Sequence, residues 1–222
     1  MISIIMSTYN SEDTLSEAIE SILIQTFKDF EFLIMNDGSN DGTDEILNHY
    51  LKKDARIKIF KNTNNIGLTK SLNYLVNKSK YEIIARQDSD DLSHKQRLEK
   101  QYNLLNSTVF SICTTRSQSI QTRKKIPNLS FYLPIKLLLK FKNPFVHGTL
   151  MMSKKILLDV GCYDEDYKYA QDYKLMLDLY RSGNKVKIIN EVLYYLNTKD
   201  NISSNNSHEQ KFFFNKARKA KN

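Results

Sequence analysis

The chain has 222 residues, 33 of them Lys or Arg against 25 Asp or Glu, which gives a formal net charge of +8. Hydrophobic residues make up 41% of the sequence and charged residues 26%, so the chain is too apolar for a disordered protein and too polar for a membrane bundle. Its length is sufficient for one hydrophobic core. The positive charge predicts an acidic partner and leaves nucleic acid, anionic lipid and phosphorylated small molecules open.

Cysteine use and the N-terminal residues indicate the compartment. Cys113 and Cys162 are far apart and form no CxxC pair, so we expect neither a disulfide framework nor a structural zinc site. The opening apolar run, residues 1–6, lacks the basic region and cleavage site of a signal peptide. No run approaches the ~20 apolar residues of a membrane span. We therefore expect a cytoplasmic protein that can contact the inner face of the cell membrane peripherally.

The first hundred residues alternate short apolar runs with segments of helical periodicity. The predicted strands span 2–6, 30–35, 56–60 and 81–85, and the helices between them cover 15–26, 41–53 and 68–76. Such alternation is typical of right-handed βαβ units. The sequence therefore predicts an α/β fold with a parallel sheet covered by helices on both faces.

The alternation loosens beyond residue 106. We expect strands at 109–114, 149–152, 186–189 and 192–196, a helix at 171–182, and an Asn/Ser-rich, then basic, C-terminal segment. A short basic and apolar helix is predicted between Pro134 and Pro144. It fits either a membrane surface or a place on the core with its lysines directed outward, and we favour the core.

Every strand of the first half ends in a polar cluster. These clusters are Ser7–Asn10, Asn36–Ser39, Asn62–Asn65 and Arg86–Asp91. A single cluster of this kind is most often a turn or a helix cap. In parallel sheets, however, ligands bind beyond the carboxyl ends of the strands, so all four clusters are expected to face one crevice.

The cluster after the fourth strand carries three carboxylates within four residues, Asp88, Asp90 and Asp91. Their mutual repulsion at the mouth of an apolar sheet favours a bound cation, and oxygen ligands suit Mg²⁺ or Mn²⁺. The alternative is an acidic turn in which Asp91 or Ser93 caps the next helix, and both can hold together. The sequence has neither GxxxxGK[ST] nor GxGxxG, so a cation rather than a glycine loop is expected to hold phosphates. This pattern favours group transfer from a nucleoside diphosphate.

Five stretches carry a resemblance to a known family. They are Ser7–Asn10, 33–43 (LIMNDGSNDGT), 85–101 (ARQDSDDLSHKQRLEKQ), 143–151 (NPFVHGTLM) and 160–177 (VGCYDEDYKYAQDYKLML). In this order and spacing they resemble the family 2 glycosyltransferases of the GT-A fold, and are most similar to bacterial enzymes that build capsule, lipopolysaccharide or other surface glycans. The resemblance covers nearly the whole chain, and the combination is specific where no single stretch is.

The resemblance implies a Rossmann-like, mostly parallel sheet flanked by helices, with a small acceptor-side extension. It implies a nucleotide-sugar-binding half over residues 1–106 and an acceptor-binding, catalytic-base half of the same domain over 107–200. Residues 201–222 would form a basic tail.

The resemblance also implies a role for individual residues. Asp172 would be the catalytic base, Asp90 the principal metal ligand, and Asp88 would serve the metal and the ribose. Asp37 would hydrogen-bond the base of the nucleotide. The remaining nucleotide-sugar contacts would come from Thr8, Tyr9, Asn10, Glu12, Arg86 and Ser89, and the donor and acceptor subsites from Asp91, His147 and Gln171. A histidine satisfied at the start of a strand is an equally good interpretation of His147.

Two positions depart from the family pattern. Ser7 replaces a proline, which removes no functional group, and Gln171 replaces the glutamate that more often precedes the base. If both carboxylates are needed, Gln171 predicts weak catalysis.

The reaction that the resemblance implies is an inverting, metal-dependent hexosyl transfer. The donor would be a nucleotide diphosphate sugar, with UDP as the expected nucleotide, and the cofactor Mn²⁺ or Mg²⁺. The acceptor would be a glycan or a polyprenyl-diphosphate-linked sugar in surface polysaccharide synthesis, with peripheral contact to an anionic membrane and no nucleic acid. The alternatives are a donor-binding subunit with weak catalysis and, less well supported, a Mg²⁺-dependent phospho-receiver module using Asp37 or Asp88.

Overall fold

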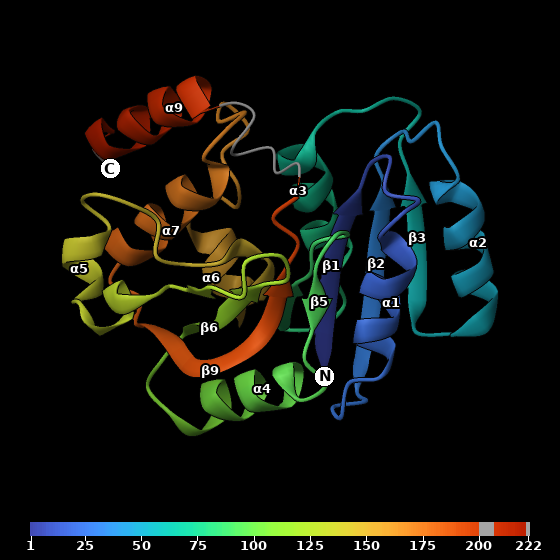
Figure 1. Ribbon diagram of the computed structural model, residues 1–222, viewed down its shortest axis with the longest axis horizontal. Coiled ribbons are helices and arrows are strands. Elements are labelled where there is room, and N and C mark those ends of the chain that lie inside the picture. The colour runs from blue at the N-terminus through green and yellow to red at the C-terminus, as the bar shows by residue number, and fades with distance from the viewer. Residues whose placement is uncertain (200–206, 221–222) are drawn as a thin grey trace.

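The computed structural model describes residues 1–199 and 207–220. Within them one nine-stranded sheet runs through the molecule in the order β3-β2-β1-β4-β8-β6-β9-β5, with β7 paired to β6 (Figure 1). The strands are β1 (Ile2–Thr8), β2 (Phe30–Asn36), β3 (Ile57–Lys61), β4 (Ile83–Arg86), β5 (Leu92–Ser93), β6 (Ile112–Ser119), β7 (Lys125–Ile126), β8 (Met151–Ser153) and β9 (Val186–Leu196). The predicted α/β class is confirmed.

Helices cover both faces of this sheet. They are α1 (Leu15–Leu23), α2 (Thr43–Lys53), α3 (Leu68–Lys78), α4 (Arg97–Ser107), α5 (Ile135–Leu138), α6 (Lys154–Asp159), α7 (Gln171–Arg181) and α9 (Ser207–Lys219), with 3₁₀ turns η1 (Leu129–Tyr132) and η2 (His147–Thr149). The apolar faces of α1, α2 and α4 pack in one core with Ile4 and Phe32, whereas α3 and α7 pack in the other with Ile5 and Leu33. Neighbouring residues of β1 and β2 therefore serve opposite layers, as the alternation of side chains along a strand requires.

The first four strands form the parallel part of the sheet. β1 pairs in parallel with β2 and β4, and β2 pairs in parallel with β3. Every residue of β2 is buried, which is typical of a parallel strand covered on both faces. This arrangement aligns the carboxyl ends of these strands at one edge.

The second half departs from the parallel pattern. β8 is antiparallel to both β4 and β6, and β5 is antiparallel to β9, while β6 and β9 are parallel. The expectation of a mostly parallel sheet is therefore correct for β1 to β4 and wrong for the rest, where the sheet is mixed. Antiparallel neighbours need no crossover helix, so the alternation that revealed the first half is absent here.

Several predicted boundaries are also corrected. The two late strands form one strand, β9, whose register against β6 shifts on both sides of Arg116. The strand expected at 109–114 is β6, which begins at Ile112, and the helix between the prolines shortens to α5. A bulge absorbs an extra residue while the ladder continues, which explains how one strand spans the polar pair Asn190 and Glu191.

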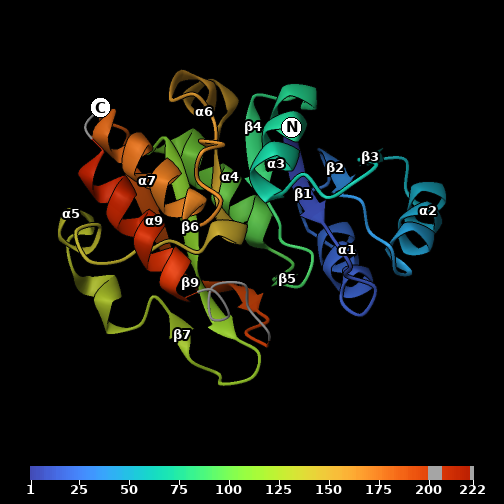
Figure 2. The same ribbon diagram turned by 90° about the horizontal axis from the view of Figure 1, so that it is seen from above.

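The C-terminal segment is partly helical. α9 lies along α7 in Figure 2, and the Phe214 ring stacks on Tyr173 with centroids 4.1 Å apart. Residue 200, and residues 201–206 and 221–222 of the predicted tail, lie outside the described residues. Among the described helices none has the length and apolarity needed to cross a membrane.

Candidate active site

The polar clusters that follow β1, β2 and β4 meet at one edge of the sheet, as predicted. The Asp37 amide donates to the Thr8 carbonyl at 2.9 Å, which joins the ends of β1 and β2. The Thr14 hydroxyl donates to the Ser89 carbonyl at 3.0 Å, which joins the loop after β1 to the loop after β4. The loops therefore form one continuous surface above the parallel strands.

Residues after β1 tie the first two loops together. Asn10 takes a left-handed φ of 48°, which asparagine tolerates, and its Oδ1 accepts from the Asn40 amide at 3.0 Å. Glu12 accepts from the Gly42 amide at 2.7 Å. Tyr9 is exposed, whereas the Thr8 hydroxyl is buried and finds no hydrogen-bond partner among the described residues. The exposed Tyr9 ring is therefore the group of this pair that a ligand can reach.

Asp37 is buried beneath the loop that follows β3. Its Oδ1 accepts from Asn62 Nδ2 at 2.7 Å and from the Ile66 amide at 3.1 Å, and its Oδ2 accepts from the Gly67 amide at 2.9 Å. These bonds fix the loop between β3 and α3 beside the other polar clusters. A contact between Asp37 and a nucleotide base stays a prediction.

The carboxylates after β4 separate into distinct environments. Asp88 forms an ion pair with Arg86, and its amide donates to the Tyr194 hydroxyl at 3.1 Å. Burial and the neighbouring Asp88 charge raise the pKa of Asp90 to about 6. Asp91 is buried and accepts from the Asn197 amide at 2.7 Å, and burial followed by the charges of Asp88 and Asp90 raises its pKa. Asp91 therefore anchors this loop to the end of β9.

Sequence reasoning did not single out Arg97, the buried cation beneath this cluster. Its side chain is fully buried on α4, and it donates to the Gly148 carbonyl at 3.2 Å and to Gln87 Oε1 at 3.3 Å. The guanidinium carbon lies 5.4 Å from the centroid of the Tyr194 ring, and burial lowers the pKa of Arg97 to about 10. The available signal was its spacing: Arg97, Leu98 and Gln101 share one helix face, so an arginine had to enter the core.

The His147 and Tyr163 side chains link the carboxylate cluster to α7. His147 Nε2 and the Tyr163 hydroxyl are hydrogen-bonded at 2.7 Å. Burial and the Arg86 charge lower the pKa of His147 to about 4, and burial raises the pKa of Tyr163. The charges of Asp88 and Asp172 raise the pKa of both His147 and Tyr163, so both carboxylates lie within electrostatic range of this hydrogen-bonded pair. Tyr163 was not predicted, because an isolated tyrosine carries no distinctive pattern.

Asp172 lies in the first turn of α7. The preceding Ala170 takes a left-handed φ of 53°, so the chain turns sharply before Gln171 and Asp172 begin the helix. Asp172 Oδ2 accepts from Asn143 Nδ2 at 2.7 Å, a bond that orients the carboxylate. A carboxylate in the first helical turn is favoured by the helix dipole. Gln171 adjoins it and is partly exposed.

The side chains described above offer chemical groups that can act together in one site. Asp88 and Asp90 offer carboxylate oxygens, Asp172 offers a carboxylate that can accept a proton, and His147, with its lowered pKa, is neutral near both Asp88 and Asp172. Among the described residues no three His, Cys, Asp or Glu side chains are grouped to hold a metal ion by themselves.

Comparison with known proteins assigns the family. Residues 3–161 match the model of the family described as Glycosyl transferase family 2. The O-antigen biosynthesis glycosyltransferase WbnJ of Escherichia coli is 39% identical over 185 residues, which is 80% of this chain and 70% of WbnJ. The uncharacterised glycosyltransferase MJ1057 of Methanocaldococcus jannaschii is 34% identical over 214 residues, 92% of this chain and 73% of that protein.

Solved structures support the fold. Staphylococcus aureus TarS 1–349 in complex with UDP-GlcNAc superposes with a TM-score of 0.80 at 22% identity, over 92% of this chain and 60% of that one. The mannosyltransferase PcManGT from Pyrobaculum calidifontis, solved with GDP-Man and Mn²⁺, gives a TM-score of 0.73 at 16% identity, over 90% and 58% of the two chains. The chain thus spans about three fifths of the length of these structures and shares their GT-A fold. From the family match over residues 3–161 and its named relatives, the chain belongs to glycosyltransferase family 2.

Proposed function

We propose that this chain transfers a hexosyl group from a UDP-sugar to a hydroxyl of a glycan or lipid-linked acceptor, with inversion and with a divalent metal ion, in surface polysaccharide synthesis. The observation that carries this proposal is the hydrogen-bonded pair His147 and Tyr163, whose pKa values are shifted by the charges of both Asp88 and Asp172. The O-antigen role printed for WbnJ supports the product class, and the UDP-GlcNAc bound to TarS supports the nucleotide.

On the donor side, the proposal assigns the nucleotide to the surface formed by the loops after β1, β2 and β4. The exposed Tyr9 ring is suited to a stacking contact with a nucleotide, and the neighbouring Thr8 would support the loop from below. Arg86 and Ser89 would face the diphosphate side, and Asp37, Asn10 and Glu12 would hold the loops and contact the base or ribose.

The residues present fit a divalent cation. Asp90 is desolvated beside Asp88, has no ion-pair partner among the described residues, and its pKa is raised to about 6. A cation would relieve this repulsion. Two carboxylates without a third suit Mg²⁺ or Mn²⁺, which commonly take one or two carboxylates together with substrate phosphates. When bound, the ion would supply Lewis-acid stabilisation of charge on the diphosphate.

On the acceptor side, Asp172 would take the proton of the acceptor hydroxyl as that oxygen attacks the anomeric carbon. Asn143 holds the carboxylate through Oδ2 at 2.7 Å, which leaves Oδ1 for the acceptor. The C–O bond to the acceptor forms as the bond to the diphosphate breaks, and the leaving diphosphate departs from the opposite face. His147, neutral at ordinary pH, and Gln171 would contribute hydrogen bonds to the sugars.

The first experiment tests the base. Purified wild type, Asp172→Asn and the matched surface control Asp159→Asn are supplied with a panel of nucleotide sugars, Mn²⁺ and acceptor. We expect wild-type transfer for a UDP-sugar, an unchanged rate for Asp159→Asn, and a loss of about 10²–10⁴-fold in kcat for Asp172→Asn, the usual contribution of a general base. Equal rates for wild type and Asp172→Asn would reject the assignment of the base, and rates at background level in both would favour the donor-binding subunit that Gln171 suggests.

The second experiment tests the metal and the nucleotide. UDP binding is followed by thermal shift or calorimetry, with Mn²⁺ present and after chelation. We expect binding to weaken at least tenfold on chelation, because a bound cation must otherwise offset the charge of Asp88, Asp90 and the diphosphate. Asp90→Asn should abolish the difference between the two conditions. A preference for GDP over UDP would overturn the nucleotide assignment alone.

A further inference from the structure

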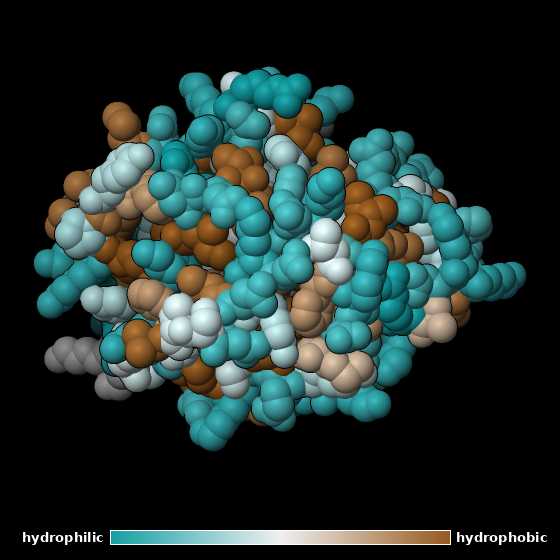
Figure 3. All heavy atoms as spheres, turned by 90° about the horizontal axis from the view of Figure 1, so that it is seen from below, coloured by the Kyte–Doolittle hydropathy of each residue, from teal (hydrophilic) through white to brown (hydrophobic). Residues whose placement is uncertain are grey.

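A compact lobe of residues 129–142, made of η1, α5 and their flanks, exposes several large apolar side chains. Leu129, Tyr132 and Phe141 are 79%, 72% and 70% exposed, and Leu133 and Leu137 are also exposed. A single exposed hydrophobic residue is ordinary, but a cluster of this kind marks an interaction surface. Figure 3 shows hydrophobic residues gathered among hydrophilic ones on the left of the molecule, the side on which Figure 1 places α5 and α9.

The lobe is anchored to the protein on its other side. Leu138 and Leu139 are each only 4% exposed, and the Tyr173 hydroxyl donates to the Leu139 carbonyl. The Lys142 ammonium donates to the Ser130 hydroxyl at 2.8 Å, which holds the two ends of the lobe side by side. The segment therefore satisfies its own core contacts and still presents a second apolar face.

The charge in the sequence segment that contains the lobe has one sign. From residue 100 to residue 158 the sequence contains no Asp or Glu and ten Lys or Arg. Within the lobe, Lys136, Lys140 and Lys142 are exposed beside the apolar side chains. A second copy of the chain would bring the same lysines against one another in a two-fold contact, which like charges disfavour. The partner that complements this basic and apolar face is a surface that carries negative charge and also accepts apolar side chains at its boundary.

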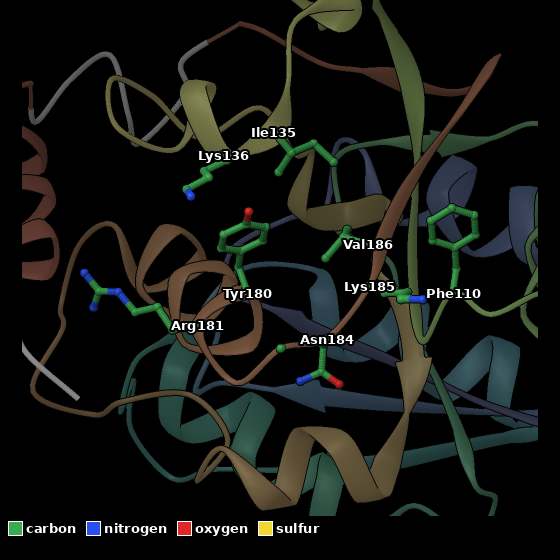
Figure 4. Close-up of a pocket in the computed structure, with 9 residues that line it drawn as sticks. Phe110, Ile135, Lys136, Tyr180, Arg181, Asn184, Lys185 and Val186 are labelled. Carbon is green, nitrogen blue, oxygen red and sulfur yellow. The ribbon is translucent and has the colours of Figure 1, made fainter.

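A neighbouring hollow extends the basic surface beyond the lobe. It has a volume of about 500 Å³, and Ile135 and Lys136 of α5 line it together with Tyr180, Arg181 and Lys185. Figure 4 shows Ile135 and Lys136 on one side of this hollow and Tyr180 and Arg181, from α7, on the other. No acidic side chain lines it. Three cations around an apolar floor suit an anionic headgroup.

The position of the lobe relates it to the candidate active site. The lobe ends at Lys142, and the next residue, Asn143, donates the hydrogen bond that orients Asp172. A surface that binds the lobe therefore lies close to the acceptor side of the site.

We propose that residues 129–142 dock on an anionic lipid bilayer, with Leu129, Tyr132 and Phe141 entering the interfacial region and Lys136 and Lys140 contacting headgroups. Apolar and aromatic residues bordered by lysines are the composition of interfacial anchors, and juxtamembrane Lys and Arg are attracted by anionic leaflets. The advantage of this docking for reaching a lipid-linked acceptor rests on the proposed function. Binding of the lobe to the bilayer does not require catalysis.

The test is co-sedimentation of the full chain with vesicles, without donor or acceptor. One set of vesicles is phosphatidylcholine and the other is phosphatidylcholine with phosphatidylglycerol. We expect binding to the anionic vesicles only, weakening as salt is raised. The variant Leu129→Ser/Tyr132→Ser/Phe141→Ser and the variant Lys136→Glu/Lys140→Glu should each lower the partition coefficient at least tenfold. The controls, Ile24→Ser/Leu51→Ser/Tyr74→Ser and Lys52→Glu/Lys70→Glu, alter exposed apolar residues and exposed lysines elsewhere and should bind as wild type does.

Three results would overturn the proposal. The first is that the wild type does not bind to anionic vesicles. The second is that the lobe variants and their controls lose vesicle binding equally. The third is that the wild type forms a dimer in solution and that the triple serine variant does not. Circular dichroism checks that each variant is folded, and the lysine variant keeps the test valid if the serine variant misfolds. Transfer to a water-soluble acceptor is measured in parallel. Failure of vesicle binding with normal transfer rejects only this proposal, and loss of transfer with normal vesicle binding rejects only the proposed function.

Discussion

At the scale of single residues, Gly148 shows how tightly the site is packed. A Cβ added there would lie 2.1 Å from the Tyr194 hydroxyl oxygen and 2.5 Å from Asp88 Oδ2. Tyr194 is fully buried against Arg97, so its ring cannot move away easily, whereas the Asp88 side chain is partly exposed. Glycine is required here by close approach rather than by backbone conformation.

We therefore predict that Gly148→Ala displaces Asp88. Overpacking should lower the free energy of unfolding by about 1–3 kcal/mol. Transfer activity should fall about a hundredfold, because a misplacement of about 1 Å has that effect on catalysis. Urea unfolding and donor kinetics check the two effects. Adding Tyr194→Phe should not restore activity, since the ring carbon Cζ would still lie 2.6 Å from the new Cβ. Normal kinetics in Gly148→Ala would contradict the packing argument.

His147 gives a prediction about pH. Its pKa is about 4 in the folded protein, lowered from 6.5 mainly by burial, so the unfolded chain takes up the proton at a higher pH than the folded one. The free energy of unfolding therefore decreases as pH falls from about 6.5 to about 4, by at most about 3 kcal/mol from this residue.

The measurement compares wild type with His147→Gln. The stability difference between them should change by up to about 3 kcal/mol between pH 7 and pH 4.5, with wild type losing more, because only wild type gains a proton on unfolding. Taking the difference removes the opposing effect of Asp90, whose folded-state pKa is raised. His208→Gln on the exposed face of α9 is the matched control. A difference independent of pH would show that His147 is not held neutral.

At the scale of elements, two of the three consecutive phenylalanines of α9 lie in contrasting positions. Phe214 stacks on Tyr173 of α7, whereas Phe212 is 61% exposed. Phe214→Ala should lower the free energy of unfolding by about 2–3 kcal/mol, as for a side chain that is largely but not fully enclosed. Phe212→Ala on the same helix should change it by no more than about 0.5 kcal/mol. Thermal unfolding of the pair measures this difference, and similar losses in both would argue against the packing of α9 on α7.

The elements also show where sequence patterns are informative. The helices after β1, β2 and β3 were predicted within a few residues because each carries a regular apolar face against a parallel sheet. The strands β6, β8 and β9 were displaced or divided in the prediction. Their pairing depends on partners distant in the chain, and a bulge interrupts the ladder at Arg116, so local periodicity does not define them.

At the scale of the whole molecule, the two predicted halves share one sheet. β4 pairs with β8 through Ile83–Ser153 and Ile84–Met152, and Arg97 and Gln101 of α4 donate to carbonyls of Gly148 and Thr149. Separating the halves would leave buried backbone groups and an arginine unpaired. The halves are therefore expected to depend on each other for stability.

We predict a single cooperative unfolding transition. Far-UV circular dichroism and tyrosine fluorescence, which is available because the chain contains no tryptophan, should report the same midpoint in urea. A fragment of residues 1–106 should not fold alone, because β4 would lose its β8 partner. Two separated transitions, or a stable 1–106 fragment, would contradict this prediction.

The sequence by itself determined the α/β class, the four parallel strands, and the polar clusters at their carboxyl ends. These follow from local periodicity and from the rule that parallel strands expose their ends at one edge. The carboxylates Asp88, Asp90 and Asp172 were also identifiable, because they stand in recognisable stretches. Their proposed roles as metal ligands and base stay predictions.

Only the tertiary structure decided which side chains complete the site. Tyr194 and Gly148 lie against Asp88, Arg97 donates to the Gly148 carbonyl, and Tyr163 is hydrogen-bonded to His147. These residues come from separate elements, and no local sequence pattern predicts their contacts. The same is true of Asp91, whose side chain holds the end of β9. Burial and charge at these positions depend on contacts between segments up to 106 residues apart in the chain. Long-range packing, which no local pattern encodes, therefore decided the electrostatics of this candidate site.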